Sequence, residues 1–191
     1  MNQPYGRPKP SVSALLVVDV QNAAVARSPY LGDSVLANIA RLIAACRTAG
    51  VEVIHVQHDG EPGDENEPGG EGWQIHAAVR PDPGEKIVRK RFNSAFRETD
   101  LRSYLVDRHI GALILVGIQT EYCIDTTCRV AFENGFSVVL PERTNTTFDN
   151  GDLTASQIYE HHNRRIFDGR FATLRSLPDT LEAVRYGRSF T

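Results

Sequence analysis

The sequence predicts an α/β fold with three layers, in which a mainly parallel, six-stranded sheet carries helices on both faces. Two observations support this fold class. Apolar segments of strand length alternate along the chain with longer segments of helical period. The strand-like segments are nearly continuous runs of Val, Leu and Ile, which is typical of strands buried on both faces of a parallel sheet. The expected topology is Rossmann-like.

Six segments have the pattern of strands. The segment 112–117 is the most apolar of them, and the segment 14–20 is apolar except for Asp19 near its end. Strands that alternate with helices in this way pair in parallel, so their carboxyl ends should meet at one edge of the sheet. The six predicted strands are residues 14–20, 51–56, 86–90, 112–117, 136–140 and 171–174.

The connecting segments carry helix signals. Asp33 is the expected N-cap of the first helix, and Gly50 marks its end. Thr120 is the expected N-cap of a helix over 121–134, and the last helix is expected after Pro178. The remaining helices are expected over about 100–109 and 151–165.

Length and composition indicate one globular domain over residues 1–191. The chain is 41% hydrophobic and has a formal net charge of −3, so it lacks the basic excess that nucleic-acid binding requires. No apolar run approaches the roughly 20 residues of a membrane helix. Three cysteines are too few for a disulfide scaffold, so a reducing cytoplasm is expected. The proline-rich residues 1–12 are expected to form an extended segment without a signal peptide.

One segment differs in composition from the rest. Residues 59–72 (DGEPGDENEPGGEG) contain only Gly, Pro, acidic residues and one Asn. Such a segment has nothing apolar to bury, so it is expected to be an exposed, mobile loop. It follows a strand end on the expected ligand side of the sheet, where it would serve either as a solvated insertion or as a lid that brings Trp73 over a substrate.

Three residues that can perform chemistry fall at expected strand ends. Asp19 ends an apolar strand that offers it no partner, and a buried carboxylate requires one. Lys90 lies between Arg89 and Arg91, and strand alternation allows Lys90 alone to point inward while both arginines point away. Cys123 lies at the third position of a predicted helix, where the helix dipole should lower the pKa of a thiol. Cys46 and Cys128 are interpreted as packing residues.

The chain resembles the isochorismatase-like cysteine hydrolases, which include nicotinamidases, N-carbamoylsarcosine amidase and biuret hydrolase. The resemblance covers about residues 14–174, and its three motifs occur in the order found in the family. They are LLVVDVQ, which contains Asp19, KRFNSAF, which begins at Lys90, and GIQTEYCIDTTCRVA, which contains Cys123.

The resemblance implies a catalytic triad with Cys123 as nucleophile, Asp19 as base and Lys90 as their partner. It also implies a non-proline cis peptide between Ile118 and Gln119, and an oxyanion hole made by the backbone N–H groups of Gln119 and Cys123. With these groups the protein would hydrolyse a C–N bond of a small non-peptide amide, carbamoyl or ureido compound through a thioester.

Position and resemblance together suggest further pocket residues. They are Gln21, Asn22, Gln57, His58, Trp73, Phe96 and Tyr122. No metal or other cofactor is expected, because the Asp-x-His-x-x-His motif of nicotinamidases is absent after the second strand. His58, Asp59 and His76 have a different spacing, and a zinc site needs three or four convergent ligands.

Two other functions are compatible with the motifs. One is an isochorismatase-type ether or ester hydrolase, which the presence of Cys123 disfavours because true isochorismatases lack this cysteine. The other is a non-catalytic small-molecule or redox sensor that uses a thiol of low pKa. The resemblance further implies a homo-oligomer, a dimer or a tetramer, and a small-molecule substrate as the partner.

Overall fold

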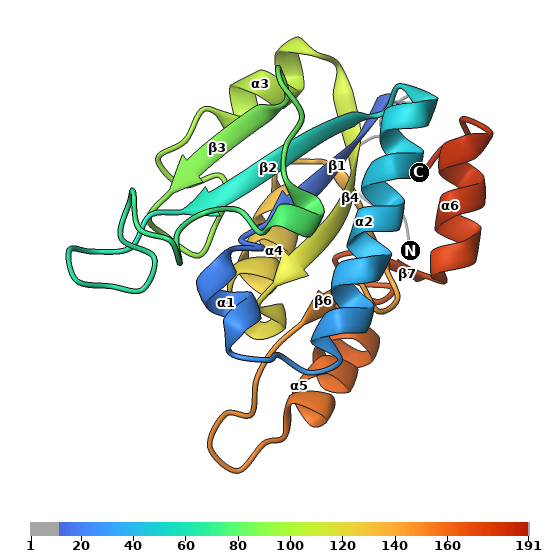
Figure 1. The fold of residues 1–191 in the computed structure, drawn as a ribbon. Helices are drawn as coiled ribbons and strands as arrows, with labels where there is room; N and C mark the ends of the chain where they lie inside the picture. Colours follow the sequence, from blue (N-terminus) through green and yellow to red (C-terminus); the bar gives the residue numbers. More distant parts are fainter. Residues whose placement is uncertain (1–11, 191) are drawn as a thin grey trace.

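The computed structural model describes residues 12–190, which form a parallel sheet between two layers of helices (Figure 1). The sheet order is β3-β2-β1-β4-β5-β7, with β6 paired to β4, and every strand pairing is parallel. The strands are β1 Val12–Val18, β2 Glu52–His58, β3 Lys86–Lys90, β4 Ile110–Ile118, β5 Ser137–Pro141, β6 Asn145–Thr146 and β7 Thr173–Arg175.

The predicted fold class and the six predicted strands are confirmed. The seventh strand, β6, has only two residues, which is too short to produce a recognisable alternation. An extended segment was expected over residues 1–12. Val12 is the first residue of β1, and the rest of that segment lies outside the described residues.

The helices enclose two separate apolar layers. Leu16 of β1 packs with α3 and α4 on one face of the sheet, whereas the adjacent Leu15 packs with α2 and α6 on the other. Both residues are fully buried, as strand alternation requires of a sheet covered on both sides. The α-helices are α1 Asn22–Ala26, α2 Gly32–Ala49, α3 Leu101–Asp107, α4 Asp125–Glu133, α5 Ala155–His161 and α6 Leu177–Arg185. Among the residues described, no helix is both long and apolar enough to cross a membrane.

Two predicted helix starts are wrong. Asp33 is not an N-cap, because α2 begins one residue earlier and Leu31 precedes it in a left-handed conformation. Thr120 is not an N-cap either: it is the first residue of a π-helical turn, Thr120–Ile124, that leads into α4. The Thr120 hydroxyl donates a hydrogen bond to buried Asn145 Oδ1 at 2.8 Å, so a tertiary contact replaces the expected cap.

The short helix α1 was not predicted, and two of the predicted helices have other bounds than expected. Ser176 caps α6, which therefore starts before Pro178, and the helix expected over 151–165 is divided into α5 and a π-helical segment. The remaining short segments are the 3₁₀ turn Ala77–Val79 and the π-helical segment His162–Phe167.

Strands β1 and β4 approach each other closely at their carboxyl ends. Gly117 has φ +134°, and a Cβ atom at this position would lie 2.0 Å from the carbonyl oxygen of Val18. The next residue of β4, Ile118, joins Gln119 through a cis peptide bond, as the family resemblance implied. Glycine at position 117 therefore allows the end of β4 to lie beside Asp19, which follows Val18.

We expect Gly117→Ala to destabilise the fold by more than about 3 kcal/mol, because the added Cβ collides with backbone that cannot move independently. Gly135→Ala is the matched control. Gly135 also has a positive φ, of +87°, but a Cβ there meets nothing within 4 Å, so the cost should be about 1 kcal/mol. Urea denaturation of the two variants measures the difference, and equal losses of stability would contradict the proposed clash.

Candidate active site

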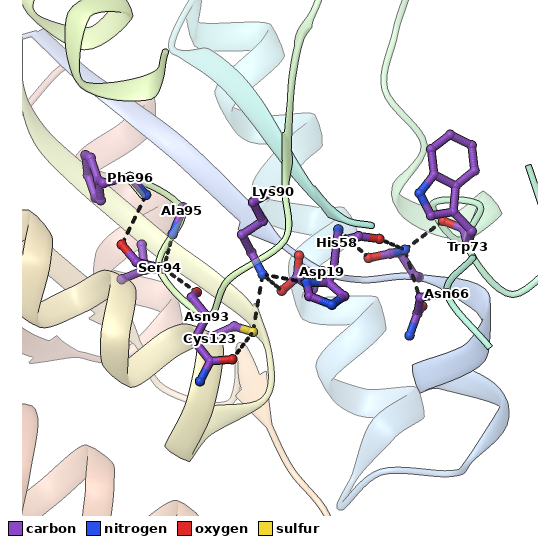
Figure 2. A network of polar contacts seen from close by, with 12 residues as sticks. Asp19, His58, Asn66, Trp73, Lys90, Asn93, Ser94, Ala95, Phe96 and Cys123 are labelled. Carbon is purple, nitrogen blue, oxygen red and sulfur yellow. Dashed lines mark hydrogen bonds and ion pairs between the residues drawn. The ribbon is translucent and has the colours of Figure 1, made fainter. Parts of the chain in front are cut away.

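Lys90 is a fully buried cation at the end of β3. Its side chain is 0% exposed, and Figure 2 shows it pointing between Asp19 and Cys123. Lys90 Nζ lies 2.5 Å from Asp19 Oδ2 and 3.4 Å from Cys123 Sγ. Arg89 is exposed on the opposite side of the strand, as alternation predicts.

Asp19 follows β1 and closes the other side of the Lys90 ammonium. Its backbone N–H donates to the carbonyl of Val56 at 3.0 Å, which fixes the residue between β1 and β2. The residue is 7% exposed, and its Oδ1 atom has no hydrogen-bond partner among residues 12–190. A buried carboxylate oxygen without a donor remains able to accept a proton.

Cys123 lies in the π-helical turn that follows β4 and is partly exposed. Burial of the thiol and the nearby Asp19 carboxylate raise its pKa to about 12, and Lys90 only partly opposes them. The predicted lowering of the thiol pKa by a helix N-terminus is therefore wrong. The thiol is protonated at neutral pH, and its Sγ atom lies 3.9 Å from Asn93 Oδ1.

The charges at this site are balanced. Burial alone would lower the pKa of Lys90, but Asp19 and Cys123 more than offset burial and raise it, so the lysine is an ammonium. Burial and the Lys90 charge lower the pKa of His58, whose Nδ1 atom lies 3.4 Å from Lys90 Nζ. His58 is therefore neutral near pH 7, and the site contains one ion pair, a neutral imidazole and a neutral thiol.

Asp19 and Cys123 open into a cavity of about 220 Å³. Of the sequence-predicted site residues, Gln21, His58, Gln119 and Tyr122 also line it. The lining residues that were not predicted are Ala24, Arg27, Glu65, Asn66, Asn93, Ile118 and Phe148.

Four predicted pocket residues do not line this cavity. Phe96 stacks on Phe136 in the core, with ring centroids 5.9 Å apart. The Trp73 indole N–H donates to Asp59, and its backbone carbonyl accepts a hydrogen bond from the Gln57 side chain at 2.9 Å. Asn22 donates its side-chain amide to the carbonyl of Glu71. The last three of these side chains fix the 59–72 loop and the segment after it.

Ala24 lies in α1 and Ile118 at the end of β4, whereas the other unpredicted lining residues come from turns and loops whose positions no sequence periodicity indicates. Asn93 lies inside the Lys90 motif, and its proximity to Lys90 in the sequence was the only available signal. Asn66 accepts a hydrogen bond from Gln21 Nε2 at 3.3 Å, which brings the acidic loop to the cavity. Phe148 lies in the connection between β6 and α5.

The three residues considered as metal ligands are engaged separately. His58 faces Lys90, Asp59 accepts from Trp73 and Arg89, and His76 Nδ1 accepts from the Ala78 N–H. Within the part of the chain that the structure describes, no three His, Cys, Asp or Glu side chains are placed to bind a metal ion.

Comparison with known proteins identifies relatives of this fold and sequence. The isochorismatase domain model matches residues 13–175. A streptothricin hydrolase of Streptomyces noursei is 40% identical over 140 residues, which are 72% of this chain and 56% of that protein. A second one is matched over 51% of its length, so the chain spans about half of these relatives. The ureidoacrylate amidohydrolase of Variovorax paradoxus is 33% identical, with 72% of each chain covered.

Solved structures give the same result. An isochorismatase family protein has a TM-score of 0.80 at 33% identity, covering 88% of this chain and 100% of that one. An isochorismatase from Pseudomonas putida has a TM-score of 0.84 at 29% identity, covering 92% and 93%. A cysteine hydrolase from Pseudomonas syringae, at 20% identity and a TM-score of 0.86 over 97% and 99%, shares the fold. The domain match and these relatives show that the chain belongs to the isochorismatase-like family.

Proposed function

We propose that the protein hydrolyses a C–N bond of a small non-peptide amide, carbamoyl or ureido compound, with Cys123 as nucleophile. One observation carries the proposal: a single buried ammonium, Lys90 Nζ, lies within 3.4 Å of the Cys123 sulfur and within 2.5 Å of the Asp19 carboxylate. Relatives named amidohydrolase and streptothricin hydrolase support C–N chemistry for this site.

In the first half of the reaction, Asp19 takes the thiol proton as Cys123 Sγ attacks the substrate carbonyl carbon. A base is required because the pKa of the thiol is about 12 in the free enzyme. The negative charge then passes to the carbonyl oxygen, which the backbone N–H groups of Gln119 and Cys123 are proposed to bind. When the C–N bond breaks, protonated Asp19 gives its proton to the leaving nitrogen, and a thioester on Cys123 remains.

In the second half, water replaces the amine. Asp19, again a carboxylate, removes a proton from a water molecule that attacks the thioester carbonyl carbon. The carbon–sulfur bond breaks, the proton returns to Cys123, and the acid product leaves. Lys90 remains charged throughout and stabilises the negative charge that develops on Asp19 and Cys123 in turn.

The raised thiol pKa argues against the sensor function. A redox-sensing cysteine reacts as a thiolate and is accordingly a group of low pKa. The pKa of Cys123 is instead raised, so in the proposed mechanism this residue becomes a nucleophile only when Asp19 removes its proton in the presence of substrate. Among the described residues of the site, no contact favours ether hydrolysis over amide hydrolysis.

We further propose that the protein is a homo-oligomer and that it works in a reducing cytoplasm. All three cysteines are free thiols, and Cys46 and Cys128 are fully buried. An enzyme that depends on a reduced nucleophile fits a reducing compartment. Light scattering of the purified protein measures the oligomeric state.

Cys123→Ala should lower amide turnover by at least about 10³-fold while leaving the fold intact, because it removes the nucleophile and only one sulfur atom. Ammonia release from a panel of primary amides and ureido compounds measures turnover, and circular dichroism checks the fold. Cys128→Ala is the matched control, since it removes a cysteine of the same region that lies in the core. Unchanged turnover in Cys123→Ala would refute the mechanism.

Asp19→Asn should change two rates in opposite directions. The Asp19 charge contributes to the high pKa of Cys123, so its removal leaves Lys90 unopposed and lowers that pKa. Alkylation of Cys123 by iodoacetamide at pH 8 should then become at least about threefold faster, while amide turnover is lost. Mass spectrometry locates the alkylated residue, and Asp33→Asn, an exposed carboxylate on α2, is the control. Slower alkylation in Asp19→Asn would contradict the assigned charge coupling.

Lys90→Met should slow alkylation and destabilise the fold. Without the ammonium, the buried Asp19 carboxylate has no partner, a change that costs about 3–5 kcal/mol in comparable buried pairs. The pKa of Cys123 should rise further, because Lys90 is the group that lowers it. The double variant Lys90→Met with Asp19→Asn should recover part of the lost free energy of unfolding, which urea denaturation measures. Absence of recovery would argue against a direct charge pair.

A further inference from the structure

An ion pair stands at the mouth of the cavity. Arg27 follows α1, Glu65 belongs to the 59–72 loop, and Arg27 Nη1 lies 3.3 Å from Glu65 Oε1. Both residues line the same cavity as Cys123, and their side chains are about half exposed, at 54% and 50%. An ion pair with this exposure is weak, so a ligand with a charged group can displace either partner.

The interior of the cavity cannot select a charged substrate by itself. Asp19 is paired with Lys90, and His58 and Cys123 are neutral because of their shifted pKa values. The other polar groups of the interior are the side-chain amides of glutamine and asparagine residues. Selection by charge must therefore take place at the mouth, where Arg27 and Glu65 are the two charged residues.

The surroundings of the pair favour a cation as the ligand. The Arg27 guanidinium contacts both the Phe148 ring, 4.5 Å from its centroid, and the Glu65 carboxylate. Glu65 uses only Oε1 in this pair, and in the part of the chain that the structure describes its Oε2 atom has no partner. A substrate ammonium can therefore approach Glu65 at Oε2 and then compete with Arg27 for the carboxylate.

The loop adds to this preference. Residues 59–72 contain six acidic residues and no basic one, so a carboxylate approaching Arg27 would be repelled by the same loop that neutralises Arg27. The loop is fixed next to Glu65, because Asn66 accepts from the Gly60 N–H at 2.8 Å and donates its own N–H to Asp64 at 2.7 Å. Tyr122, which is exposed and also lines the cavity, is an aromatic residue of the kind that binds cations.

We propose that the cavity takes amides that carry a cationic group at the end remote from the scissile bond, and that Glu65 binds this group in competition with Arg27. The reaction in this inference rests on the proposed function, but the binding does not. Glu65 is here a specificity residue, and Arg27 is a competitor that limits affinity for the cation.

Binding to the Cys123→Ala protein tests the inference without turnover. The probes are 5-aminopentanamide, pentanamide and glutaramate, which share a primary amide and differ in the charge at the other end. Calorimetry should give a Kd for 5-aminopentanamide that is roughly three- to fivefold below that of pentanamide, with glutaramate the weakest. Glutaramate as the tightest ligand, equal affinities, or no detectable binding of 5-aminopentanamide would each overturn the inference.

Two substitutions in the same background assign the preference to its residues. Glu65→Gln should abolish the preference for 5-aminopentanamide over pentanamide, whereas Arg27→Gln should increase it by a further factor of about three. Glu61→Gln removes one charge from the same loop but does not line the cavity, so the preference should persist. A preference that Glu61→Gln removes as completely as Glu65→Gln would show a diffuse field and would refute a binding role for Glu65.

Ammonia release by the unmodified protein separates this inference from the proposed function. Turnover of pentanamide with no charge preference in binding refutes the inference and leaves the amidohydrolase proposal in place. A charge preference in binding without turnover of any probe supports the cation site and counts against amide hydrolysis.

Discussion

The ammonium of Lys90 is sealed from water, and the arrangement of the site follows from the need to balance that charge. Adjacent strands lie about 4.8 Å apart, so the end of β3 is separated from that of β1 by roughly twice this distance. The long lysine side chain extends past β2 to reach Asp19 at the end of β1, and it also contacts Cys123 after β4. Three strand ends are thus connected through one nitrogen atom, and the neutral state of His58 follows from the same positive charge.

The sequence contained enough information for the architecture of the sheet, because long apolar runs bounded by turn signals are typical of strands buried on both faces. Helix boundaries were less accessible. Threonine is a common N-cap residue, but the Thr120 hydroxyl donates its hydrogen bond to Asn145. This partner is 25 positions away in the sequence, and only the folded chain brings it near. Leu31 shows the reverse case, since no local rule anticipates a leucine in a left-handed conformation before a helix.

The residues of the candidate site were likewise predictable from the sequence only in part. Asp19 and Lys90 were predictable as partners, because a charged residue at the end of a buried strand is costly to bury without one. The role of Cys123 was implied by the family resemblance, since a free cysteine is most often a packing residue. Phe96 and Trp73 were not distinguishable from packing residues by sequence, since cores and pockets use the same apolar types. The thiol pKa was predicted with the wrong sign, because a helix position indicates the local dipole but not the extent of burial or the nearness of a carboxylate.

The 59–72 loop is joined to the sheet where it begins and directly after it ends: the Asp59 N–H donates to the carbonyl of Lys90 at 2.8 Å, and Trp73 forms the second anchor. Gln21 and Gln57, both buried, donate their side-chain amides to the same carbonyl oxygen, that of Trp73. Most of the residues before this anchor are exposed and make contacts within the loop. Substitutions in the exposed middle of the loop are therefore expected to leave Asp19 and Lys90 in place. In the proposed mechanism, substrate selection by Glu65 and bond breaking at Cys123 therefore depend on different segments of the chain.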